Sequence, residues 1–263
     1  MLIHLTYIGA ATVLIEIDGY RILTDPALDP AGQHYSFGWG TGSTKTATPK
    51  LPADGLGKID LVLLSHDQHA DNLDKAGRRM LQLQNPCVLT TPSGAKRLGL
   101  PSAIGLQDWQ SHSVRTPSGL VIKITATPAR HGPPLSLPVV GHVTGFVLEW
   151  PGQIHGALYF TGDTVWFKPL NEVGQRFQIG TAFLHLGQVK FGLSGPVKYT
   201  FNAEQGIRMA RSLGARARSI PIHFEDWSHF SEGRGQASRK FAEASPPLPV
   251  TWLERGVRTA WEA

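Results

Sequence analysis

The chain has 263 residues, of which 41% are hydrophobic and 17% are charged, as in an ordinary soluble globular protein. No apolar run approaches the ~20 residues that a membrane span requires, so we expect no membrane-spanning helix. The net charge of +5 would suit an anionic substrate or nucleic acid. The basic residues are scattered along the chain, however, which favours a solvated surface.

The N-terminus and the cysteine content predict a cytoplasmic protein. Residues 1–6 lack the basic region that begins a signal peptide, and Glu16 and Asp18 soon interrupt the apolar residues. The single cysteine, Cys87, cannot form an intrachain disulfide and lies in an apolar run. A reducing compartment is therefore the expected location.

The N-terminal part of the chain predicts an antiparallel meander followed by a long loop. Residues 2–8 and 12–17 alternate apolar and polar side chains, and glycine-containing turns separate them from each other and from a third strand at 20–24. Residues 26–57 are rich in Gly, Pro, Ser and Thr and have no clear period. A loop of this length in a compact domain is usually a lid or a binding loop.

Strand and helix patterns alternate through the rest of the chain. The expected strands are 61–64, 87–90, 103–106, 112–116, 119–127, 142–150, 155–161, 181–186, 219–223 and 250–253. The expected helices are 73–83, capped by Asp71 or Asn72, then 92–98, 169–177, 203–213, capped by Asn202, and one that begins at 237. This order suits two sheets packed face to face with helices outside. No stretch has the composition of a linker, so we expect one domain over residues 1–263.

The segment 61–74 carries the strongest chemical signal. An apolar strand stops at His66, and two imidazoles and up to three carboxylates follow within nine positions, in the sequence HDQHADNLD. Buried polar groups cost free energy unless they are bonded. A divalent cation gives a reason for crowding them at a strand end, because imidazole and carboxylate both suit zinc, iron or manganese.

Three later segments repeat this arrangement of a ligand-type side chain just after an apolar strand. They place His131 after residues 119–127, Asp163 after 155–161 and His223 at the end of 219–223. A lone histidine after a strand is more often structural than a ligand. Four such segments in one chain favour a shared metal site, where a ligand would sit among converging strand ends and loops.

The order and flanks of these segments resemble the metallo-β-lactamase superfamily of metal-dependent hydrolases. The similarity is greatest to the branch that contains ascorbate-6-phosphate lactonase-like and N-acylphosphatidylethanolamine phospholipase D-like enzymes. The matching motifs are GAATVLI (9–15), LTDP (23–26), SHDQHADNLD (65–74), PARH (128–131), FTGDT (160–164) and PIHF (221–224). The resemblance implies an α/β fold, a four-layer αββα sandwich of two mixed β-sheets flanked by helices, with a metal centre at one edge.

The resemblance also implies roles for individual residues. His131 would join the first-motif histidines, His66 and His69, at one metal position, and Asp163 would bridge two metals. Asp71 and His223 would hold the second metal, and Asp71 would also take part in proton transfer. The cofactor would be one or two divalent ions, zinc in the first place, with manganese or iron as alternatives, and a metal-bound hydroxide would be the nucleophile.

The first motif departs from the superfamily pattern H-x-H-x-D-H. Aligned backwards from Asp71, His69 is the second histidine and Asp67 stands where the first belongs. Aligned forwards, His66 is the first and Gln68 stands where the second belongs, while Asn72 replaces the last histidine under the first alignment. An amide oxygen is a poorer zinc donor than imidazole, so we expect the second metal position to be weakened, empty or adapted to a harder ion.

The sequence therefore predicts a metal-dependent hydrolase acting on an ester, lactone or phosphodiester-type small molecule. His185, His229 and Trp166 are expected to bind substrate, with His185 a second candidate for the missing ligand. The alternatives are a nucleic-acid phosphodiesterase of the same superfamily, which the absence of a basic module makes the weaker expectation, and a catalytically degenerate metal-binding module. The sequence predicts no oligomeric state.

Overall fold

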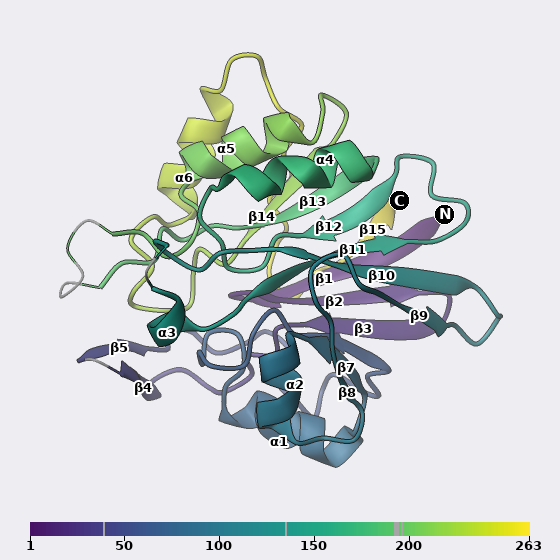
Figure 1. Ribbon diagram of the computed structural model, residues 1–263, viewed down its shortest axis with the longest axis horizontal. Helices are drawn as coiled ribbons and strands as arrows, with labels where there is room; N and C mark the ends of the chain where they lie inside the picture. Colours follow the sequence, from purple (N-terminus) through teal and green to yellow (C-terminus); the bar gives the residue numbers. More distant parts are fainter. Residues whose placement is uncertain (39, 135, 192–194, 196) are drawn as a thin grey trace.

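The computed structural model describes residues 1–38, 40–134, 136–191, 195 and 197–263. In this part of the chain two large β-sheets pack against each other, and helices cover their outer faces (Figure 1). A small hairpin lies outside both sheets. The predicted four-layer αββα sandwich is confirmed.

The first sheet has the strand order β15-β1-β2-β3-β6-β7-β8. Its strands are β1 (Leu2–Gly9), β2 (Thr12–Ile17), β3 (Tyr20–Thr24), β6 (Leu61–Leu63), β7 (Cys87–Thr90), β8 (Ala103–Gly105) and β15 (Arg258–Glu262). The pairs from β15 to β3 are antiparallel, whereas β3, β6, β7 and β8 run parallel. The carboxyl ends of β3, β6 and β7 therefore lie at one edge of the sheet.

The second sheet has the strand order β14-β13-β12-β11-β10-β9. Its strands are β9 (Ser111–Arg115), β10 (Val121–Pro128), β11 (Thr144–Glu149), β12 (Ala157–Phe160), β13 (Ile179–His185) and β14 (Arg218–Ile222). The strands β12, β13 and β14 are parallel, and β10 shares their direction because two antiparallel pairings separate it from β12. Four carboxyl ends of this sheet thus share one edge.

Helices close the sandwich on both sides. In Figure 1, α1 (Lys75–Gln84) and α2 (Pro92–Leu98) lie beside the first sheet, and α4 (Asn171–Arg176), α5 (Ala203–Ser212) and α6 (Arg234–Ala242) lie over the second. Short turns α3 (Leu137–Val140) and η1 (Lys168–Leu170) complete the described helices. Between the sheets, Leu5 and Ile15 share one buried cluster with Phe146 and Phe183, and the last two belong to the second sheet. Removing these apolar surfaces from water stabilises the layered arrangement.

Most predicted elements are present, with bounds that differ by one to a few residues; three predictions are wrong and one strand was missed. The expected loop 26–57 contains a hairpin of β4 (His34–Gly38) and β5 (Thr41–Thr44). Residues 250–253 form only an isolated bridge from Val250 to Ser219, and the strand β15 was not predicted.

The first helix also starts later than predicted. Its N-cap is Asp74, whose Oδ1 accepts from the amide of Gly77 at 2.9 Å, and not Asp71 or Asn72. The prediction that Asn202 caps α5 is confirmed. Among the described residues, none of the helices is both long and apolar enough to cross a bilayer.

Candidate metal centre

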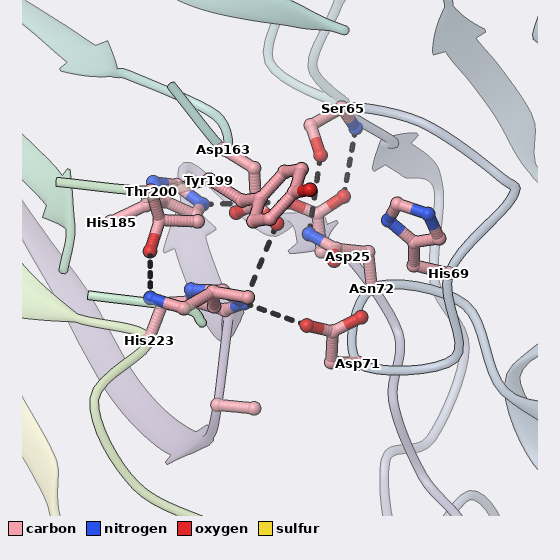
Figure 2. Close-up of polar contacts among 12 residues, drawn as sticks. Asp25, Ser65, His69, Asp71, Asn72, Asp163, His185, Tyr199, Thr200 and His223 are labelled. Atoms are coloured by element: carbon pink, nitrogen blue, oxygen red, sulfur yellow. Dashed lines mark hydrogen bonds and ion pairs between the residues drawn. The ribbon is translucent and has the colours of Figure 1, made fainter. Parts of the chain in front are cut away.

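The strand ends of both sheets meet at one edge of the sandwich, and ligand-type side chains gather there. His66 and Asp71 follow β6 in the first sheet. In the second sheet, His131 follows β10, Asp163 follows β12, and His223 follows β14. Figure 2 shows Asp163 and His223 facing Asp71 and His69 across this edge. The parallel pairing of the strands therefore brings together segments that are far apart in the chain.

The backbone is forced into unusual conformations where two of these residues enter the site. Gly162, just before Asp163, has φ +61°, and a Cβ there would lie 2.5 Å from the Thr144 carbonyl oxygen. His223 itself has φ +59°, a left-handed backbone conformation that residues other than glycine rarely adopt. Its amide donates to the Ala10 carbonyl at 2.7 Å, which holds it in place. Backbone strain of this kind clusters at functional sites.

His66, His69 and His131 form the first group, with ligand nitrogens that all lie within 4.8 Å of one another. His69 Nδ1 is 3.1 Å from His66 Nε2 and 3.0 Å from His131 Nε2. His131 Nδ1 lies 2.8 Å from the Tyr199 carbonyl oxygen and donates to it. That bond leaves the lone pair of His131 Nε2 facing the other two rings, which is how proteins orient metal-binding histidines.

These three rings are neutral at physiological pH. Burial, followed by the repulsion between neighbouring imidazolium groups, lowers the pKa of His66 well below its usual value and that of His131 to about 3. Burial also lowers the pKa of His69. Because metal ions bind neutral imidazole, the group is held in its binding form without deprotonation.

Asp71, Asp163 and His223 form the second group, again with ligand atoms within 4.8 Å of one another. His223 Nε2 is 3.3 Å from Asp71 Oδ2 and 3.6 Å from Asp163 Oδ2. All three side chains are buried. Two carboxylates and an imidazole thus converge at the same sheet edge as the three histidines.

The charges of the second group are strongly perturbed. Burial raises the pKa of Asp163 to about 6. Burial also acts on Asp71 and His223, but here the ion pairs outweigh it. They hold the pKa of Asp71 well below its usual range and raise that of His223 to about 9. The buried site therefore concentrates negative charge that a cation would neutralise.

The geometry distinguishes the two alignments of the first motif. Asp67 pairs with Arg97 of α2, whose Nε lies 3.0 Å from Asp67 Oδ2, and so faces away from the site. His66 and His69 both face His131, with two residues between them in the chain. The intervening Gln68 packs against Gly141, where a Cβ would lie only 1.7 Å from its Nε2.

The three expected substrate-binding residues lie in different places. His229 Nε2 is 3.1 Å from Asp71 Oδ2, beside the second group. His185 is buried with Nε2 3.5 Å from Asp25 Oδ2, and it is not among the residues that line the pocket described below. Trp166 packs against the core, and the Arg208 guanidinium lies 4.2 Å from its ring centroid.

A narrow pocket of about 30 Å³ opens onto the two groups. Its base is His69, Asp71, His131 and His229, and its walls are Phe37, Thr41, Val140, Val189, Phe191 and Tyr199. In the sequence, Phe37 stands out only as part of the long loop 26–57, and no motif marks the other apolar wall residues, Val140, Val189, Phe191 and Tyr199. Their signal was weak, because apolar residues in loops pack under the surface as often as they line a site.

The donor set fits a divalent cation. Asp163 Oδ1 is buried without a hydrogen-bond partner among the described residues, and His223 Nε2 has only its ion pairs with Asp71 and Asp163. Such atoms are costly inside a protein unless something binds them. Histidine nitrogens and carboxylate oxygens in two groups are the ligands that zinc, iron or manganese take. The residues present therefore match the metal that the superfamily resemblance implies.

A four-layer αββα sandwich with such a site at its edge defines a class, the metal-dependent hydrolases of the metallo-β-lactamase superfamily. The comparison with known families agrees, because residues 20–224 match the model described as "Beta-lactamase superfamily domain". The chain belongs to this family, and the resemblance drawn from its sequence motifs is confirmed.

Individual relatives are more distant. The chain is 25% identical over 236 residues to N-acyl-phosphatidylethanolamine-hydrolyzing phospholipase D 1 of Caenorhabditis elegans, with 83% of this chain and 63% of that protein covered. It thus spans less than two thirds of that relative's length. It is 27% identical to a UPF0173 metal-dependent hydrolase of Exiguobacterium, covering 84% of this chain and 86% of that one.

Solved structures share the fold. The isothiocyanate hydrolase from Delia radicum gut bacteria superposes with a TM-score of 0.80 at 23% identity, covering 99% of each chain. This superposition supports the architecture, and an identity this low leaves the substrate open.

Proposed function

We propose that residues 1–263 form one domain that hydrolyses a small neutral molecule with the help of divalent metal. His66, His69 and His131 would hold one ion, and Asp71, Asp163 and His223 would hold a second. The observation that carries the proposal is the convergence of two groups of ligand atoms from four distant segments at one sheet edge. Zinc is the ion we expect at the three histidines, because it prefers tetrahedral sites with nitrogen ligands.

The bound metal would acidify a water molecule and polarise the bond under attack. The chain's own residues would prepare this chemistry. Asp71 stays ionised, because His223 and His229 contact its Oδ2 at 3.3 Å and 3.1 Å, and it can accept a proton from the attacking water. The Tyr199 carbonyl keeps the His131 ring in one tautomer through the bond at Nδ1.

The pocket lining favours a neutral substrate over a phosphodiester. Its described walls are aromatic or aliphatic, apart from Thr41, and include neither lysine nor arginine. An anionic phosphodiester would enter this lining without the arginine or lysine partners that usually bind phosphate. An ester or lactone carries no charge, and its apolar part would gain from contact with Phe37, Val189 and Phe191. The nucleic-acid alternative gains no support from this lining.

A chelation experiment with a substrate panel tests the proposal. Protein stripped with a chelator should lose hydrolysis of p-nitrophenyl acetate and dihydrocoumarin, and one or two equivalents of Zn²⁺ should restore it. Bis(p-nitrophenyl) phosphate should be a poorer substrate by at least about tenfold, which is one missing charge contact of ~1.4 kcal/mol. Hydrolysis that survives chelation, or a preference for the phosphodiester, contradicts the proposal.

A pair of variants separates metal loss from general damage. Asp163→Ala should retain less metal than the wild type and should not hydrolyse either neutral substrate. Asp108→Ala is the matched control, because Asp108 is exposed and lies outside both groups. Turnover by Asp163→Ala at the wild-type rate, despite loss of metal, would show that the site is not catalytic.

A further inference from the structure

The second group has lost a ligand that the superfamily motif supplies. Asn72 stands at that position and is fully buried. Oriented to suit its neighbours, its Nδ2 donates to Asp163 Oδ2 at 3.2 Å and to Asp71 Oδ1 at 3.3 Å, and its Oδ1 accepts from Ser65 Oγ at 3.3 Å. The amide therefore acts as a hydrogen-bond donor to two carboxylates and presents no free donor atom to a cation.

A histidine from a different part of the chain contacts the other carboxylate oxygen of Asp71. His229 Nε2 lies 3.1 Å from Asp71 Oδ2, the same oxygen that His223 Nε2 approaches at 3.3 Å. The side chain of His229 is only 3% exposed. Two imidazole nitrogens thus converge on one carboxylate oxygen of the second group.

The His229 ring is held by packing. It stacks on Phe191 with an interplanar angle of 18°, and it meets Phe37 and Phe230 at centroid distances of 5.5 Å and 4.6 Å. Its Nδ1 is buried without a hydrogen-bond partner among the described residues, so aromatic contacts set its orientation. The preceding Ser228 donates its amide to the Thr44 carbonyl at 3.0 Å, which ties this loop to β5.

We infer that His229 is the fourth protein ligand of the second metal position and replaces the histidine that Asn72 displaced. This inference rests on the proposed function. His185, the other candidate, is the weaker one by geometry. Its Nδ1 contacts Thr161 Oγ1 at 3.1 Å, and its Nε2 faces Asp25 at 3.5 Å. In the second metal position, the imidazole of His229 thus takes the place of the motif histidine, and the position keeps its affinity for zinc.

The test counts metal ions in matched variants. Wild type, His229→Phe, His185→Asn and the double variant His229→Phe/Asn72→His are stripped, loaded with Zn²⁺, desalted and analysed for zinc per chain. Phenylalanine keeps the ring among Phe37, Phe191 and Phe230, and asparagine at 185 keeps the contact with Thr161. We expect two ions in the wild type, one in His229→Phe, two in His185→Asn and two in the double variant.

Each departure from this pattern has a distinct meaning. Two ions in His229→Phe, or failure of Asn72→His to restore the second ion, overturns the inference alone. One ion in the wild type overturns the inference together with the second metal position of the proposed function. No ion in the wild type overturns the proposed function together with the inference. Should His229→Phe not fold, as judged by circular dichroism, His229→Ala takes its place, and the visible spectrum of Co²⁺-loaded protein reports the loss of one imidazole ligand independently.

Discussion

Replacing Asp163 with asparagine should stabilise the metal-free protein and reduce its stabilisation by metal. Asp163 is fully buried, and its Oδ1 has no hydrogen-bond partner among the described residues. Burial raises its pKa from 3.8 to about 6. The folded chain therefore resists ionisation of this group, whereas the unfolded chain does not. Asparagine has nearly the same shape and stays uncharged.

The size and pH dependence of this effect follow from the shift. At 1.36 kcal/mol for each pKa unit, a rise from 3.8 to about 6 corresponds to about 3 kcal/mol. The folded-state pKa lies above the unfolded-state value, so the protein loses stability as the pH rises between these values. Asp163→Asn should thus match the wild type below about pH 4 and exceed it by about 3 kcal/mol above pH 6.

Urea denaturation in the presence of EDTA at pH 4 and pH 8 measures this difference. In a thermal melt at pH 8, about 3 kcal/mol corresponds to a gain of roughly 6–12 °C for a chain of this size. Addition of Zn²⁺ should then stabilise the wild type more than the variant, because only the wild type keeps the Asp163 ligand of the second ion. A metal-free variant that is less stable than the wild type at pH 8, or one that gains as much from Zn²⁺, would refute the reasoning.

Three further substitutions test other parts of the account. Gly77→Ala should lower the free energy of unfolding, measured in urea, by about 1–3 kcal/mol, because the new Cβ would lie 1.9 Å from the Pro26 carbonyl oxygen. Alanine favours helix more than glycine does, so a more stable variant would show that this clash is absent. Lys45→Ala should cost about 3–5 kcal/mol in the same assay, since it leaves the buried Asp74 without the Nζ now 3.0 Å away, and a loss below 1 kcal/mol would argue against a structural ion pair. Phe37→Ala should reduce kcat/KM for p-nitrophenyl acetate by about tenfold with unchanged zinc content, because a pocket wall is lost, and an unchanged kcat/KM would remove Phe37 from the substrate site.

The sequence was enough to predict the layers and most strands because burial leaves a periodic trace. The parallel strand β13, for example, is buried along its whole length and consists mostly of apolar residues. Edge elements left no such trace. The strand β15 alternates exposed residues with one half-buried and one buried residue, and among the described strands it pairs only with β1, at the other end of the chain. Pairing with β1 determines where this strand lies, and the local sequence pattern alone could not predict it.

The candidate site was predictable where a ligand follows a strand. His131, Asp163 and His223 each stand just after an apolar run, and the parallel topology brings such ends together. The choice between the two alignments of the first motif could be made only from the structure. There Asp67 forms an ion pair with Arg97 of α2 and does not face the site. The sequence predicted only substrate binding for His229, because no predicted strand or helix fixed the orientation of its side chain. In the structure, packing against Phe37 and Phe191 fixes that orientation.

Anomalous diffraction from crystals of untagged protein, purified without chelator, tests the central claim most directly. The account predicts one metal peak among His66, His69 and His131 and a second among Asp71, Asp163 and His223. No peak at either group, in crystals whose protein holds stoichiometric metal by elemental analysis, would contradict the account.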